Sequence, residues 1–61
     1  MTIFLVFEQT SLMTWTVVKT FKEEQNAKDY CDMQNQLNKP EFDSWGYTEG
    51  VYHTYSPMEL E

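Results

Sequence analysis

Cys31 and His53 are the only cysteine and the only histidine in the chain, and a thiolate with an imidazole base is a recurrent nucleophilic pair. Such a pair works only when the two side chains are adjacent and a third group orients the base. Cys31 instead falls in a helical pattern of apolar residues, where a free cysteine behaves as a small hydrophobe. His53 shares one side of a predicted strand with Glu49, which permits a pH-sensitive pair, although a histidine among tyrosines is more often a surface residue. We therefore expect no catalytic residue.

Metal ligation needs several ligands at matched spacing, and the chain offers few. A structural zinc site takes four nitrogen or sulfur ligands, which one cysteine and one histidine cannot supply. The ten acidic residues include no Asp-x-Asp-x-Asp-Gly loop of the kind that binds calcium. The sequence therefore predicts no metal, no cofactor and no enzymatic activity.

The acidic residues gather instead on the exterior of a predicted helix and in the loop that follows it. Negative charge on one side of a small protein steers association toward a basic surface. A tryptophan beside a glycine in that loop is the type of side chain that anchors protein interfaces. We predict a binding site for a protein with a basic surface, made of Glu24, Asp29, Asp32, Glu41, Asp43 and Trp45. The alternative is that the acidic residues form only a solvated face.

Charge excludes several other kinds of partner. Four lysines against ten acidic residues give a formal net charge of -6 at pH 7, and arginine is absent. Proteins that bind nucleic acid carry the opposite sign, and so do surfaces that dock on anionic membranes. The apolar run at 3–7 is too short to span a bilayer or to act as a signal peptide. With a free cysteine, these features predict a cytoplasmic protein that binds neither nucleic acid nor membranes directly.

The length of 61 residues predicts one small domain, 1–61, with a net stability of roughly 3–5 kcal/mol. Residues 57–61 follow the last predicted strand and are expected to form a mobile tail. The final Leu60-Glu61 matches the dipeptide that expression vectors leave before a histidine tag, and it also fits a native end.

Apolar spacing predicts two strands followed by a helix and a third strand. Residues 2–8 are apolar on both faces, which indicates a central strand, and residues 13–20 alternate more cleanly. Thr20 and Glu23 have capping-box spacing, so a helix is expected over 21–37 with Ala27, Tyr30, Cys31 and Leu37 on its apolar stripe. Residues 39–46 are expected to be a loop, and residues 47–55 the third strand.

These elements predict an α+β fold of β-β-α-β order. The three strands should form a sheet in the order 2-1-3, with the first strand in the centre and antiparallel to both neighbours, and the helix packed on one face. The other face would then keep more apolar surface than a monomer should expose. We therefore expect a homodimer that buries it.

The same order of features resembles short proteins of unknown function from bacteriophages and bacteria. The resemblance rests on the apolar strand ending in Phe7-Glu8, the Val17-Val18 strand, and the helix with Ala27 and Tyr30 that closes on Leu37-Asn38. It implies a β-β-α-β fold and a phage origin, and it implies no activity.

Together, these patterns predict a small acidic protein-interaction module. If the chain is phage-encoded, it would act in the host cytoplasm as a modulator or inhibitor of a host protein. The alternative that remains open is a structural or accessory homo-oligomer with no enzymatic role.

Overall fold

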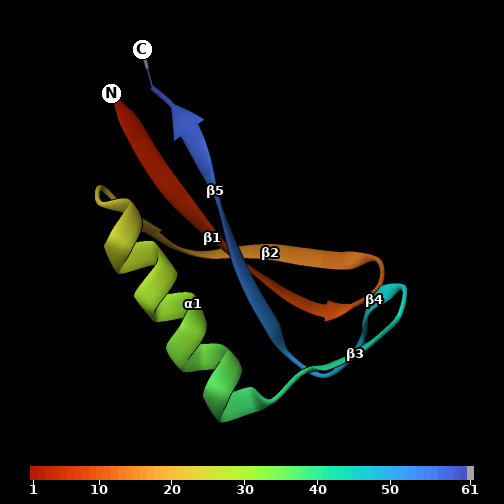
Figure 1. Cartoon of the computed structure of the whole chain (residues 1–61). Helices are drawn as coiled ribbons and strands as arrows, with labels where there is room; N and C mark the ends of the chain where they lie inside the picture. Colours follow the sequence, from red (N-terminus) through yellow and green to blue (C-terminus); the bar gives the residue numbers. More distant parts are fainter. Residues whose placement is uncertain (61) are drawn as a thin grey trace.

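The computed structural model describes residues 1–60 and shows an α+β protein with one helix and two antiparallel sheets (Figure 1). The elements in chain order are β1 (Thr2–Ser11), β2 (Thr14–Phe21), α1 (Glu24–Asn38), β3 (Glu41–Asp43), β4 (Gly46–Glu49) and β5 (Tyr52–Glu59). The strands β2, β1 and β5 form the larger sheet, and β3 pairs with β4 in the smaller one.

β1 lies in the centre of the three-stranded sheet, antiparallel to both β2 and β5. Its composition explains the position, because a strand that is apolar on both sides is best placed between two neighbours. The predicted sheet order, with the first strand in the middle, is confirmed. The β1–β5 register is continuous, whereas β2 has a bulge at Val18, which has no partner opposite Val6 or Phe7.

The third strand of the larger sheet was placed wrongly by the sequence. Residues 47–49 belong to β4, and β5 begins only at Tyr52 because Gly50, with a φ of 95°, turns the chain between them. The predicted strand end at Tyr55 was also wrong, since β5 continues through Pro57 to Glu59. Pro57 is tolerated because β5 is an edge strand and its position alternates in phase with His53, whose N–H points away from β1 toward Asn35.

Three residues of the expected tail are therefore part of the sheet. Residues 57–59 pair with residues 2–4 of β1, and Glu61 lies outside the described residues. The Glu59 carboxylate accepts hydrogen bonds from the Thr2 hydroxyl at 2.6 Å and from the Met1 amino group at 2.9 Å. The bond from Thr2, then the one from the amino terminus, lowers the pKa of Glu59.

The helix begins at Glu24 rather than at Phe21, so the predicted capping box at Thr20 and Glu23 was wrong. Glu23 is the N-cap and makes no capping bond with its side chain. The reason is tertiary: Phe21 stays in β2 opposite Phe4, and its ring packs on Tyr30 with 5.6 Å between centroids. The helix ends one residue later than expected, at Asn38.

The core is small and is made of residues from α1 and the three-stranded sheet. Its buried apolar members are Val6, Ala27 and Cys31, and four rings pack around them at partial exposure: Phe4, Phe21, Tyr30 and Tyr55. Leu37, which was expected on the apolar stripe of the helix, is 72% exposed. Few side chains therefore hold the helix against the strands.

Candidate protein-interaction site

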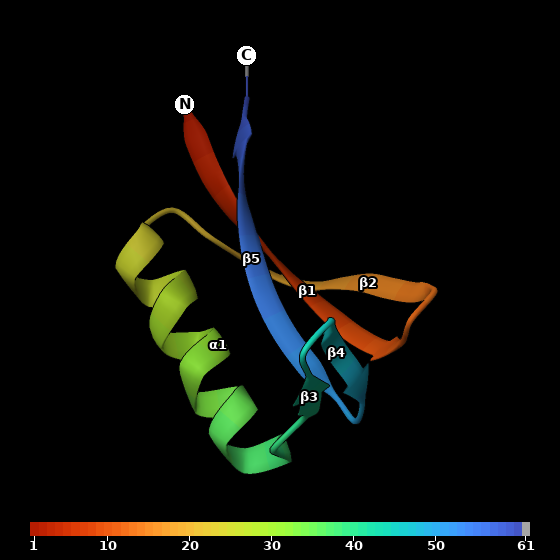
Figure 2. The same ribbon diagram turned by 45° about the vertical axis from the view of Figure 1, so that its right-hand side comes forward.

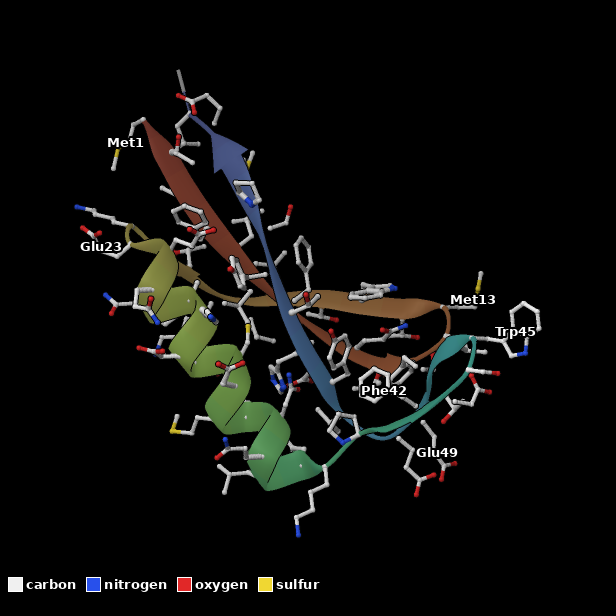
Figure 3. The ribbon with its side chains drawn as sticks, viewed as in Figure 1. Met1, Met13, Glu23, Phe42, Trp45 and Glu49 are labelled. Atoms are coloured by element: carbon white, nitrogen blue, oxygen red, sulfur yellow. The ribbon has the colours of Figure 1, made fainter. Side chains whose placement is uncertain are left out.

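The predicted partner-binding residues fall into two groups on different parts of the molecule. Glu24, Asp29 and Asp32 are exposed on α1, whereas Glu41, Asp43 and Trp45 lie on β3 and in the turn before β4. Figure 3 shows Trp45 projecting from the end of the molecule opposite Glu23, which precedes the helix. The fold thus does not join the six residues into one surface.

The β3–β4 hairpin, residues 41–49, presents Trp45, which is 94% exposed. The turn that carries the ring is fixed locally. Asp43 accepts a hydrogen bond from the Trp45 backbone N–H at 2.7 Å, and Gly46 takes a φ of 117° that other residues rarely adopt. The backbone of the turn is therefore held while the indole points into solvent.

An aromatic cluster attaches the base of the hairpin to β5. The Phe42 ring meets the edge of Tyr52 with 5.0 Å between centroids, and Tyr47 stacks on Tyr52 at 5.9 Å. The Thr48 hydroxyl donates to the Glu41 carbonyl at 3.0 Å, and the Tyr47 hydroxyl donates to the Gly50 carbonyl. Sequence reasoning had placed residues 39–46 in a loop, because a three-residue strand of exposed side chains gives no periodic signal.

Glu41 and Glu49 face each other across the hairpin. A hydrogen bond between the two carboxyl groups, followed by the charge of Glu49 and then by desolvation, raises the pKa of Glu41. Like charges in directly opposite positions destabilise an antiparallel pair. Repulsion between Glu41 and Glu49 thus destabilises the hairpin at neutral pH.

We expect Glu41→Gln to raise the melting temperature at neutral pH. Because folding raises this pKa, the folded state binds more protons than the unfolded state, and stability falls as the pH rises through the raised pKa. The gain from Glu41→Gln should therefore shrink on acidification and vanish once both carboxyls are protonated. Melting curves of the variant and the wild type across this range measure the difference.

The double variant Glu41→Gln with Glu49→Gln is the matched control. Either single substitution removes the repulsion, so the double variant should gain clearly less than the two single gains added together. Strictly additive gains at neutral pH would contradict a direct interaction between the two carboxyl groups.

The turn between β1 and β2 presents two more exposed apolar side chains. Met13 is 91% exposed and Leu12 is 65% exposed, and Figure 3 shows Met13 at the same end of the molecule as Trp45. The Ser11 hydroxyl donates to the Thr14 hydroxyl at 2.8 Å and closes this turn. We call Leu12, Met13 and Trp45 the apolar tip. Sequence reasoning missed the first two, although an apolar pair in a turn was a usable signal.

Cys31 on α1 and His53 on β5 are both buried. Cys31 is buried as predicted, and burial, followed by the charge of Asp32, raises the pKa of its thiol. His53 is not a surface residue, because only 3% of it is exposed. Its Nε2 lies 3.4 Å from a carboxylate oxygen of Glu8, which pairs with it across β1 and β5, and its Nδ1 has no hydrogen-bond partner among residues 1–60.

Comparison of the chain with protein-family models, with curated proteins and with solved structures gives no match. Over residues 1–60, no helix is both long enough and apolar enough to cross a membrane. Within the same part of the chain, no three histidine, cysteine or acidic side chains are grouped as a metal site would need.

Proposed function

We propose that this chain is a protein-interaction module rather than an enzyme, and that its partner binds the apolar tip. The observation that carries this proposal is Trp45, which is 94% exposed on a hairpin whose turn and base are both fixed. Tryptophan is enriched among the residues that dominate binding energy at interfaces. A side chain presented on an ordered backbone loses little conformational entropy when it binds, which favours affinity.

The charges around the tip indicate the chemistry of the partner. Glu41, Asp43 and Glu49 lie on the hairpin that carries Trp45, and no lysine follows Lys39 in the chain. A partner with an apolar pocket bordered by lysine or arginine would receive the indole and neutralise these carboxylates. It would also relieve the repulsion between Glu41 and Glu49, which supports a basic partner over a neutral one.

The helix carboxylates have a lesser role in this proposal. We infer that α1 packs on one face of the three-stranded sheet, since its partners Val6, His53 and Tyr55 occupy positions of one face. Glu24, Asp29 and Asp32 would then add to the long-range field without touching the bound partner. The resemblance to short phage proteins favours a host protein in the host cytoplasm, whose basic site this chain would occlude or modulate.

The test is affinity purification from the cells that contain the chain, followed by binding measurements with the purified partner. We expect Trp45→Ala to weaken binding by about 30-fold or more, the loss typical of a central interface residue. Leu37→Ala is the matched control, because it also truncates an exposed apolar residue but lies at the end of α1. It should leave the affinity unchanged.

A second measurement tests the charge. Glu41→Gln with Glu49→Gln should slow association and reduce its dependence on salt, because the Debye length falls from about 8 Å at physiological salt to about 3 Å at 1 M. Equal affinities of the wild type and Trp45→Ala for every purified partner would refute the proposal.

A further inference from the structure

The three-stranded sheet has a second surface that the apolar tip does not include. Residues alternate between two sides of each strand, and Val6, Lys19, His53 and Tyr55, which contact α1 or its side chains, lie on one side. The other side carries an apolar row from all three strands, which we call the open face. Its apolar residues are Ile3, Leu5, Phe7, Trp15, Val17 and Met58.

The open face is apolar and poorly covered. Trp15 is 49% exposed, Val17 is 48% exposed and Met58 is 46% exposed. Ile3, Leu5 and Phe7 remain partly exposed although β1 is the central strand. The β3–β4 hairpin lies near one end only, where β1 ends and β5 begins (Figure 1, Figure 2). At that end Tyr52 and the buried Gln9 occupy the same side of the sheet as the open face.

The open face is also free of charge, which restricts what can cover it. The charged residues of the three strands are Glu8, Lys19 and Glu59, and all three occupy positions of the opposite side. Two chains that each carry a net charge of -6 repel one another at most orientations. When two copies meet through the open face, no carboxylate of one sheet lies against a carboxylate of the other sheet. A basic partner, by contrast, would find no carboxylate on this face to pair with.

The dimensions of the chain indicate missing contacts. It exposes 4526 Å², whereas a compact monomer of 7.3 kDa exposes about 4,200 Å². Its radius of gyration is 12.0 Å, against about 10.5 Å for a compact domain of this length. Among the residues that the structure describes, three form the buried apolar core. If the open face must be covered for the chain to fold, then the molecule that covers it must always be present. A second copy of the chain meets that condition.

We propose that the open face is a homodimer interface, in which two copies stack their sheets face to face about a two-fold axis. The product is a six-stranded sandwich with both helices outside and sheets about 10 Å apart. Three strands spaced about 4.8 Å apart and about 20 Å long give a footprint of about 300 Å² per copy. The two copies together would bury about 600 Å², below the roughly 1,200 Å² of a standard specific interface, so weak association with dissociation at high micromolar concentrations is expected.

The test is sedimentation of the full chain across micromolar concentrations, with the fold monitored by circular dichroism. We expect the wild type to dimerise and Val17→Glu to weaken the dimer by about a hundredfold, because each copy would bury an unpaired carboxylate. Leu37→Glu adds the same charge on α1, where 72% of the residue is exposed, and should not affect the dimer. Val17→Thr keeps the β-branched shape and should weaken the dimer less than Val17→Glu.

Amide chemical shifts of the wild type on dilution give a second readout that does not depend on a variant. Shifts that move in residues 3–7, 15–17 and 54–58 support stacking of the open face. Shifts confined to the apolar tip would overturn the proposed stacking of the open face. Shifts confined to the outer edge of β2 would also overturn it, because they would indicate edge-to-edge strand pairing. A monomer at all concentrations would also overturn it. Trp45→Ala should leave the dimer intact, so this proposal and the proposed partner site can fail independently.

Discussion

Replacing Val6 by alanine is expected to lower the free energy of unfolding by about 2–3 kcal/mol, a large part of the roughly 3–5 kcal/mol available to a domain of this size. Val6 is fully buried in the central strand, where it packs with Ala27 and Cys31. The substitution removes two methyl groups and leaves a cavity that a sheet paired on both sides of β1 cannot close. Urea unfolding followed by tryptophan fluorescence, at one fixed protein concentration, measures the loss.

Val18→Ala is the matched control for Val6→Ala. It is the same chemical change in the neighbouring strand, at a residue that is 41% exposed in the bulge of β2. The expected loss is below about 1 kcal/mol, because surface substitutions remove little buried area. Equal losses at the two positions would show that the core does not lie where the structure places it.

The central position of β1 could be predicted from the sequence because it depends on residue type alone. A strand with Phe4 and Val6 on one side and Leu5 and Phe7 on the other needs cover on both sides. The boundaries of the helix and of the last strand could not be predicted, because long-range contacts set them. Local capping chemistry favoured a helix start at Phe21 with Thr20 as its N-cap, but Phe21 is held in β2 by its pairing with Phe4.

The candidate site was predictable by residue type and not by geometry. Trp45 next to Gly46 indicated an exposed anchor, and the structure places the ring in solvent. The distance between the helix carboxylates and this tryptophan depends on the position of the β3–β4 hairpin. These strands have three and four residues, which is too short for a hydrophobic periodicity that predicts them. Met13 was missed because only the folded chain brings the β1–β2 turn to the end of the molecule that carries Trp45. The sequence therefore predicted the exposed tryptophan, but it did not predict which residues lie at the same end of the molecule.

Asn35→Leu is expected to destabilise the protein by about 2–4 kcal/mol, since it leaves two partly buried backbone groups without partners. The Asn35 amide accepts a hydrogen bond from the His53 backbone N–H and donates one to the His53 carbonyl, each at 2.8 Å. One side chain of α1 thus occupies the outer edge of β5 in the way that another strand would. No apolar side chain can replace these two bonds, and thermal unfolding measures their loss.

Asn35→Asp and Asn38→Ala separate this role from general effects on the helix. Asn35→Asp keeps the acceptor for the His53 N–H and loses the donor. Its free energy of unfolding should therefore fall between those of the wild type and Asn35→Leu. Asn38 also donates its side-chain amide, to the Gln34 carbonyl at 2.9 Å, but that bond is exposed and its loss should cost under about 1 kcal/mol. Hydrogen exchange gives the local evidence: the His53 amide should lose protection in Asn35→Leu and keep it in Asn35→Asp. If that amide stays protected in Asn35→Leu, then another group holds the edge of β5 and the helix is attached to the sheet by its few apolar contacts alone.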